Sequence, residues 1–271
     1  MEKAKIAVIG GTGFENLLSH AKKLHVKTPY GTVPSLLVGK LDDRKIAFIP
    51  RHGLNHSIPP HKVNYRANLF ALCKLGVECV IGTNAVGAIN TNFKPADIVV
   101  PHDFVDFTKQ RSLTFYDKAP VTHTDFSHPY CPELRRLLIE NSRRHYYAKS
   151  WDKAVLVCTE GPRFETPAEI EMFRRLGCDV VGMTGLPEVI LARELKMCYA
   201  ALCFVSNMAA GMQEKLTPLE VSQVFEKTAP SLIKILAATI AAIPEERLKC
   251  SCANALKEAR FKQCSRSSSQ S

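Results

Sequence analysis

Long apolar runs are missing from this sequence. None approaches the roughly 18 consecutive apolar residues that a membrane-spanning helix requires, and residues 1–5 lead into no apolar signal core with a small-residue cleavage site. The 14 glycines and 16 prolines have no repeating period, which excludes collagen-like and low-complexity chains. We therefore expect a soluble, cytoplasmic globular protein with no membrane partner.

A basic stripe interleaved with aromatic residues, typical of nucleic-acid-binding proteins, is also missing. The formal net charge is +10, but the basic residues are dispersed as pairs at 135–136, 143–144 and 174–175, each of which suits the solvated face of a helix. The segment from Pro244 onward holds six Lys/Arg and three Glu. The charge fits acidic small substrates better than nucleic acid, so we expect no nucleic-acid partner.

Ten cysteines in 271 residues are too sparse for the disulfide scaffold of a short secreted chain. Most lie singly in apolar runs, where we interpret them as small buried hydrophobic residues: Cys73, Cys79, Cys158, Cys178, Cys198 and Cys203. Cys250, Cys252 and Cys264 lie in a polar tail and lack the paired spacing and histidine partners of a zinc site. We predict no metal site, and a disulfide in the tail stays open.

Short β-branched runs alternate with patterns of helical spacing along the chain. Strands are expected at 5–9, 36–38, 45–49, 77–83, 97–100, 154–158, 179–183 and 199–205, and helices at 63–75, 132–144, 167–176, around 187–195 and at 218–243. Thr166 and Thr217 each open a Thr-Pro-x-Glu capping pattern. The alternation predicts one α/β domain over residues 1–243, with a central mixed sheet surrounded by helices, followed by a basic, cysteine-containing tail at 244–271.

Groups suited to an anion follow two of the expected strands. The run Gly10–Gly13 contains three glycines that let backbone N–H groups approach a ligand, and Thr12 adds a hydroxyl. Arg51 offers a fork of donors, and His52 a further donor. A plain turn and an arginine that caps carbonyls remain alternatives. A dinucleotide site is disfavoured, because Asn16 stands where that motif requires glycine.

Small or polar groups follow the other expected strands. The run Thr83–Gly87 can expose backbone amides, Phe164 can lie against a flat ring, and Glu165 can accept from a heterocycle N–H. Asn207 carries a donor and an acceptor on one planar group. Core packing for 83–87, and a carboxylate favoured by a helix N-terminus for Glu165, remain alternatives. Together these groups suit an oxyanion and a neutral heterocycle.

With these motifs the sequence resembles the trimeric nucleoside phosphorylase family, which contains purine nucleoside and methylthioadenosine phosphorylases. The resemblance covers nearly all of residues 4–243 and is carried by 10–13, 51–53, 64–68, 160–164, 181–184 and 187–189. It implies phosphorolysis of a small nucleoside, with inorganic phosphate as co-substrate and no other cofactor. It also implies a homotrimer or a dimer of trimers. An oxidoreductase and a nucleic-acid-binding protein are the rivals from other classes.

The resemblance also implies a role for each matching position. The phosphate positions are Thr12, Arg51, His52, Asn84, Ala85 and Thr184. The base and ribose positions are Val86, Gly87, Phe164, Glu165, Val181, Gly182, Met183, Asn207 and Ala209. The positions near the 5′ end of the sugar are His56, His123 and Pro218, with His123 expected to reach a neighbouring subunit. Asn207, His52 and Glu165 are the expected catalytic residues.

Two positions separate the substrate classes of this family. Adenine-type members carry an aspartate pair where this chain has Asn207 and Ala209, and a serine where it has Glu165. Asparagine with glutamate is the 6-oxopurine pattern, so the resemblance predicts cleavage of inosine, guanosine or S-methyl-5′-thioinosine. An S-methyl-5′-thioadenosine phosphorylase is the alternative.

The 5′ pocket favours an apolar group. Pro218, flanked by Leu216 and Leu219, replaces the histidine with which ordinary 6-oxopurine members bind the 5′-hydroxyl. The combination is similar to methylthioinosine-cleaving members, although an apolar pocket does not strongly reject a hydroxyl. The tail motif of Cys250 and Cys252 resembles archaeal members, in which such cysteines form a disulfide.

Overall fold

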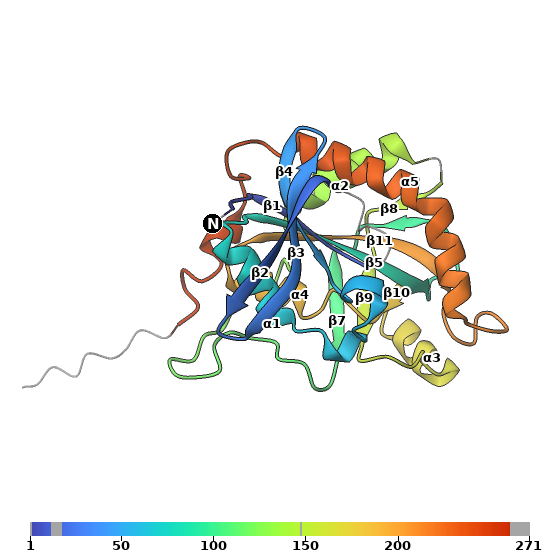
Figure 1. Cartoon of the computed structure of the whole chain (residues 1–271). Coiled ribbons are helices and arrows are strands. Elements are labelled where there is room, and N and C mark those ends of the chain that lie inside the picture. Colours follow the sequence, from blue (N-terminus) through green and yellow to red (C-terminus); the bar gives the residue numbers. More distant parts are fainter. Residues whose placement is uncertain (1, 12–17, 147, 261–271) are drawn as a thin grey trace, which may run out of the picture.

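The computed structural model describes residues 2–11, 18–146 and 148–260, which form one α/β domain around an 11-stranded mixed sheet (Figure 1). The strands are β1 Ile6–Gly10, β2 Ser19–Thr28, β3 Gly31–Leu41, β4 Arg44–Pro50, β5 Cys79–Ala88, β6 Ile98–Val99, β7 Asp103–Phe107, β8 Ser150–Trp151, β9 Val155–Thr159, β10 Val180–Gly182 and β11 Cys198–Met208. The helices are α1 Tyr65–Lys74, α2 Pro132–His145, α3 Pro167–Arg175, α4 Glu188–Glu194 and α5 Pro218–Ala242. Three short 3-10 turns are η1 Leu54–His56, η2 Pro60–Lys62 and η3 Ser251–Asn254. The predicted fold class is confirmed.

The sheet runs in the order β2-β3-β4-β1-β5-β10-β9-β7, and β11 branches from β5 to pair with β6. Strands β1, β4, β5 and β11 are mutually parallel where they pair, whereas β10 runs antiparallel to β5. Parallel strands end at the same edge of a sheet, so the segments that follow β1 and β4 emerge beside each other.

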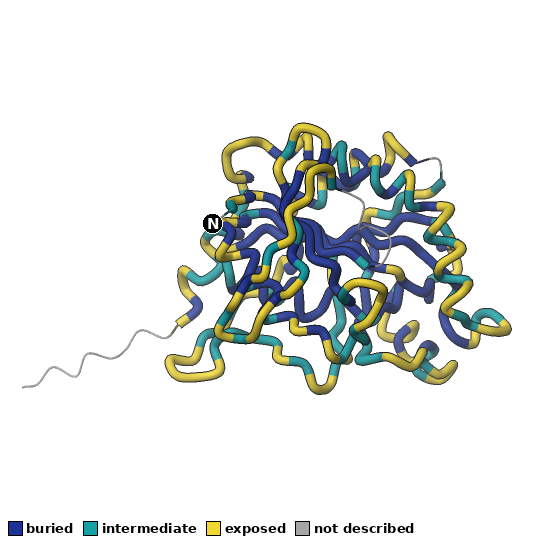
Figure 2. The backbone as a smooth tube through the Cα atoms, viewed as in Figure 1, coloured by how far each residue is buried: buried dark blue, intermediate teal, exposed yellow. Residues whose placement is uncertain are grey.

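Both faces of the sheet are covered by helices, with α1 and α4 on one face and α2 and α5 on the other (Figure 1). Leu72 of α1 and Leu191 of α4 belong to one buried cluster, and Leu138 of α2 and Leu236 of α5 belong to another. The central strands are accordingly buried along almost their whole length (Figure 2). None of the helices in the described part of the chain is long and apolar enough to cross a membrane.

Every strand and helix predicted from the sequence is present, but three strands were missed. The strand β2 is exposed at nearly every position and rich in lysine, because it forms the edge of the sheet and has no apolar signal. The strands β7 and β8 are short and only partly buried. The predicted strand at 77–83 continues to Ala88, so the run at 83–87 lies inside β5 and not after it.

The two predicted capping boxes differ. At α3 the Thr166 side chain accepts from the Glu169 N–H, and the Glu169 carboxylate accepts from the Thr166 N–H. At α5 only the first half forms, because Gln213 donates to the Glu220 carboxylate. Of the tail, residues 244–260 are described and pack on the domain through buried Leu248. Residues 261–271, which include Cys264, lie outside the described residues.

Candidate active site

An opening in the pairing of β5 marks the candidate site. One edge of β5 pairs with β11 along its length, while the other pairs with β1 up to Gly82 and with β10 from Gly87 onward. Among the strands that the structure describes, residues 83–86 therefore have a partner on one side only. Ala85 is exposed although every other residue of β5 is buried. The backbone of β5 is accessible at this opening.

The guanidinium of Arg51 lies at one end of this opening, directly after β4. Its Nη1 donates to the Thr83 carbonyl at 2.8 Å and its Nη2 to the Ile9 carbonyl at 3.3 Å, so it joins the ends of β4 and β1 to β5. Nε and Nη2 donate to the two carboxylate oxygens of Glu188, at 2.5 and 2.9 Å. Both side chains of this ion pair are 1% exposed.

The Arg51–Glu188 pair carries no net charge. Burial alone would lower the pKa of Arg51, but the adjacent carboxylate holds that pKa above its ordinary value, so the guanidinium stays charged. A guanidinium has five N–H groups, and four of those of Arg51 already have partners among the described residues. One N–H of Nη1 remains for a ligand. The alternative interpretation of Arg51, an arginine that caps backbone carbonyls, is thus partly correct, because Arg51 donates to two of them.

His52 is buried and neutral near pH 7. Burial, and then the charge of Arg51, lower the pKa of His52 from 6.5 to about 4. Its Nδ1 lies 2.9 Å from the Ile58 carbonyl oxygen, which can only accept, so Nδ1 carries the proton and Nε2 is left as an acceptor. The sequence had suggested that His52 donates a hydrogen bond to an anion. The exposed ring of His56 stacks on His52 with centroids 4.5 Å apart.

Asn84 lies within the opening and contacts Thr184. The Thr184 hydroxyl donates to Asn84 Oδ1 at 2.9 Å, and both residues are buried. This contact ties the segment after β10 to the middle of β5. Thr12, the remaining predicted phosphate residue, lies outside the described residues.

Gly87 of β5 lies between β10 and β11. It pairs with Val181 of β10 on one side and with Asn207 of β11 on the other. A Cβ at Gly87 would lie 3.1 Å from Asn207 Nδ2, so glycine leaves room for the amide. Asn207 Oδ1 accepts from Ser206 at 2.5 Å, and Nδ2 donates to the Met208 carbonyl at 2.8 Å. One N–H and one lone pair of the amide have no partner within the described parts of the chain. Ala209 follows and is buried.

Glu165 lies in the loop between β9 and α3. Its Oε1 accepts from the Thr159 hydroxyl at 2.6 Å, and burial raises the pKa of its carboxyl. The same loop passes over Met183, because a Cβ at Gly161 would lie 2.6 Å from the Met183 sulfur. Phe164 is 37% exposed. The loop therefore brings a carboxylate and an aromatic ring to the strand ends.

Of the three predicted 5′ residues, His56 stacks on His52, whereas Pro218 and His123 lie elsewhere on the surface. Pro218 is exposed at the start of α5, and the neighbouring Leu216 packs against the apolar cluster that contains Val181 and Ala209. This packing brings the start of α5 to the side of the opening formed by β10 and β11. His123 is exposed and lines a separate cavity of about 450 Å³.

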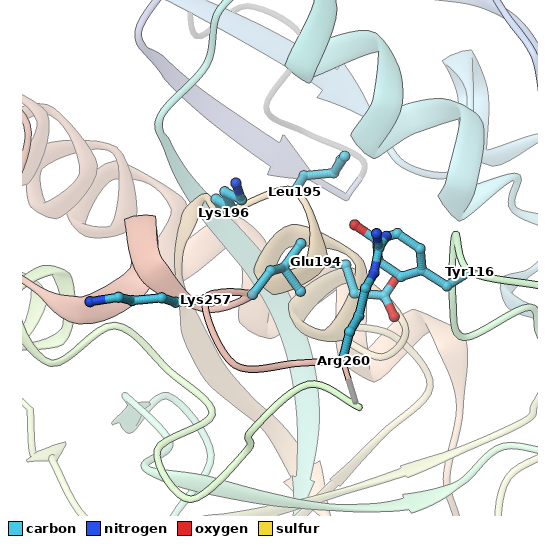
Figure 3. A pocket seen from close by; sticks show the side chains of 7 residues that line it. Tyr116, Glu194, Leu195, Lys196, Lys257 and Arg260 are labelled. Atoms are coloured by element: carbon cyan, nitrogen blue, oxygen red, sulfur yellow. The ribbon is translucent and has the colours of Figure 1, made fainter. Parts of the chain in front are cut away.

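A larger cavity of about 510 Å³ lies between α4 and the tail (Figure 3). The Arg260 guanidinium lies 5.5 Å from the centre of the Tyr116 ring, with Glu194 beside them. The lining residues are Tyr116, Glu194, Leu195, Lys196, Leu256, Lys257 and Arg260. None of them is a predicted site residue, so this cavity is distinct from the opening at β5.

Comparison with known proteins agrees with this geometry. Residues 5–241 match the family model described as the Phosphorylase superfamily. The chain belongs to this superfamily. It is 49% identical over 264 residues to "6-oxopurine nucleoside phosphorylase" of Pyrococcus furiosus, covering 94% of this chain and 98% of that one. It is also 49% identical over 258 residues to "Probable S-methyl-5'-thioinosine phosphorylase" of Methanothermobacter thermautotrophicus, covering 94% of this chain and 89% of that one.

A solved phosphorylase has the same fold. The crystal structure of a methylthioadenosine phosphorylase from an antarctic soil metagenomic library superposes with a TM-score of 0.90 at 33% identity, covering 96% of this chain and 93% of that chain. The resemblance seen in the sequence is confirmed at the level of the family and the fold. This phosphorylase is therefore an enzyme whose relatives act on nucleosides.

Sequence reasoning missed three buried residues of this phosphorylase. Glu188 and Tyr199 hold Arg51, since the Tyr199 hydroxyl donates to Glu188 at 2.8 Å. Arg111 donates to the carbonyls of Leu186 and Glu160 at 2.7 Å and so anchors the loop before α3. Glu188 could have been found from the sequence, because it is a carboxylate within the otherwise apolar run at 187–192. A buried charge requires a partner, so such a residue predicts a buried ion pair.

Proposed function

We propose that this phosphorylase cleaves the N-glycosidic bond of 6-oxopurine nucleosides with inorganic phosphate. The products are the free purine and a ribose 1-phosphate. The proposal is supported by an amide and a carboxylate at neighbouring strand ends. Asn207 lies opposite Gly87 of β5, and Glu165 accepts from Thr159 at the end of β9. A 6-oxopurine presents a donor at N1 and acceptors at O6 and N7. Glu165 accepts from N1–H, and the remaining N–H of Asn207 donates to N7 or O6.

Phosphate occupies the opening itself. The remaining Nη1 N–H of Arg51 donates to the anion, as do backbone N–H groups of β5 near Ala85. The Thr184 hydroxyl turns from Asn84 to the anion, since its hydrogen can rotate. Neutral His52 accepts at Nε2 from the hydroxyl of hydrogen phosphate. Because the Arg51–Glu188 pair is neutral, directed hydrogen bonds and not net charge hold the dianion.

These positions suit a dissociative displacement. As the glycosidic bond breaks, the electron pair of that bond passes to the purine, and positive charge develops on the ribose. Asn207 stabilises the negative charge at N7, as an oxyanion hole does. The bound phosphate stabilises the ribosyl cation and then forms the new C–O bond at C1′. Hydrogen phosphate loses its proton as it becomes the ester dianion, and the purine anion gains one proton, so the reaction balances. Holding phosphate in line makes this capture effectively intramolecular.

A 5′-methylthio group is the second specificity that a structural observation favours. Pro218 and Leu219 are exposed at the start of α5, and Leu216 packs beside the base side of the opening. An apolar wall there suits a thioether better than a hydroxyl. S-Methyl-5′-thioinosine then combines this wall with the 6-oxopurine pattern. S-Methyl-5′-thioadenosine is the alternative, and it lacks the N1–H that Glu165 requires.

The remaining expectations complete the proposal. The enzyme needs no cofactor beyond phosphate, and it assembles as a homotrimer or a dimer of trimers. His123 is exposed on the surface. A residue that contacts a neighbouring subunit must be exposed in the single chain. Sedimentation of the purified enzyme measures the assembly, and a monomer would contradict it.

A base-release assay tests the proposed function. Methylthioinosine, inosine, guanosine and methylthioadenosine are compared with and without phosphate. We expect phosphate-dependent release of hypoxanthine or guanine, with methylthioinosine the best substrate and methylthioadenosine poor. Preferential release of adenine would assign the alternative. Release that does not depend on phosphate would refute phosphorolysis.

A further inference from the structure

Four cysteines from three distant parts of the chain meet at the amino end of β11. The sulfur atoms of Cys131, Cys198, Cys250 and Cys252 all lie within 4.8 Å of one another. The Cys198 and Cys250 sulfurs are 3.4 Å apart. The sequence did not indicate this cluster, since Cys198 reads as a buried hydrophobic residue and Cys250 as part of a polar tail.

The backbone fixes the position of each cysteine. Cys131 is the N-cap residue of α2, and its N–H donates to the Tyr199 carbonyl at 2.9 Å. Cys198 begins β11, and its N–H donates to the Glu78 carbonyl at 2.8 Å. Cys250 is the N-cap residue of η3, and Cys252 lies within that turn. Three of the four cysteines are buried, so the sulfur positions do not depend on mobile side chains.

The separations match a tetrahedral thiolate centre. A Zn–S bond of about 2.3 Å places the sulfurs of a regular tetrahedron about 3.8 Å apart. The Cys198–Cys250 separation of 3.4 Å is slightly shorter than this value, and no pair of the four sulfurs is more than 4.8 Å apart. A disulfide requires about 2.05 Å, and no disulfide joins the nine described cysteines. The tail disulfide that the resemblance implies for Cys250 and Cys252 is therefore the rival of a metal site. We propose that Cys131, Cys198, Cys250 and Cys252 bind one zinc ion as thiolates.

The zinc site is structural and not catalytic. Four protein ligands complete the tetrahedron and leave no position for water or substrate. Cys198 and Asn207 lie at opposite ends of β11, which at roughly 3.3 Å per residue places them about 30 Å apart. The sequence predicted no metal site, so the proposed zinc site departs from that prediction. The proposed catalysis itself still uses no metal.

The surroundings suit a negatively charged centre. Four thiolates around Zn²⁺ carry a net charge of −2, and up to four protons leave as the thiols bind the ion. The N-terminus of α2, at Cys131, presents the positive end of a helix dipole to the cluster. This end of the helix dipole suits a negatively charged centre.

Zinc would attach the tail to the domain. Leu248, Cys252 and Ala259 are the buried residues of the described tail, and two of the four ligands come from this segment. An ion that binds only the folded chain stabilises it by an amount that rises with the logarithm of its affinity. The tail would then contribute to folding stability while taking no part in the reaction.

Metal analysis of the full chain, purified anaerobically with reductant, tests the proposal. The variant Cys252→Ser removes a ligand, and Cys73→Ser, an exposed cysteine of α1 outside the cluster, is the matched control. We expect one zinc per chain in the wild type and in Cys73→Ser, and loss of that zinc in Cys252→Ser. Chelation should lower the melting temperature of the first two proteins and leave that of Cys252→Ser unchanged.

Cobalt substitution keeps the test decisive if Cys252→Ser does not fold. Wild-type protein titrated with Co²⁺ should show the intense thiolate-to-cobalt absorption of a tetrahedral four-sulfur site, saturating at one equivalent. Failure of the reduced wild type to bind either ion stoichiometrically would overturn the proposal. Disulfides among these four cysteines in protein kept under reductant would also overturn it.

Discussion

The carboxylate of Glu188 and the guanidinium of Arg51 form a bidentate ion pair, with Nε–Oε1 at 2.5 Å and Nη2–Oε2 at 2.9 Å. Both side chains are buried. The Tyr199 hydroxyl fixes the carboxylate from a third direction. Arg51 is therefore held rigidly beside the opening in β5, with one Nη1 N–H that has no partner among the described residues. We propose that Glu188 positions Arg51 for the proposed phosphate site.

Replacing Glu188 with glutamine tests this relationship. The variant leaves a buried, unpaired guanidinium, which should lower the free energy of unfolding by about 3 kcal/mol. Bound phosphate then neutralises that charge, so saturating phosphate should raise the melting temperature more in Glu188→Gln than in the wild type. The control Glu194→Gln lies on the same helix and away from Arg51. Equal phosphate shifts in all three proteins would contradict the positioning role.

Removing the Asn207 amide should affect the chemical step. We expect Asn207→Ala to lower kcat at least ~100-fold, the scale for one lost transition-state donor. The exposed Asn92→Ala is the control and should keep wild-type turnover. Steady-state kinetics with inosine or methylthioinosine measure both. Turnover near wild type in Asn207→Ala would remove this residue from the mechanism.

Exchanging the base-recognition pair should change the preferred purine. In the double variant Asn207→Asp with Glu165→Ser, an acceptor faces N7 and the 6-amino group, and the acceptor for N1–H is lost. The ratio of kcat/KM for adenine over 6-oxopurine nucleosides should rise. An unchanged ratio, in a variant that still turns over, would show that other residues choose the base.

Burial of neutral His52 gives stability a pH dependence of known sign. The pKa of His52 falls from 6.5 to about 4 on folding, so between these values the unfolded chain binds more protons. The stabilisation is complete above pH 6.5 and is lost as the pH falls toward 4, by up to about 3 kcal/mol. Denaturant unfolding of wild type and His52→Gln at several pH values isolates this contribution. Parallel pH profiles for the two proteins would argue against it.

The sequence predicted the regular elements and the chemistry at their ends because both depend on local patterns. The apolar runs of β1, β4 and β11 and the capping residues of α3 are readable without partners in space. The opening at Ala85 could not be predicted from the sequence. It depends on where the pairing of β5 with β1 ends and where its pairing with β10 begins. The pairing of Arg51 with Glu188 and the four-cysteine cluster depend on long-range contacts in the same way.

A crystal structure of the enzyme with hypoxanthine and sulfate tests the central claim most directly. Our account predicts sulfate in the opening at residues 83–86, within hydrogen-bond distance of Arg51. It predicts the Glu165 carboxylate at N1 and the Asn207 amide at N7 or O6 of the base. An empty opening, or a bound base from which both side chains turn away, would contradict it.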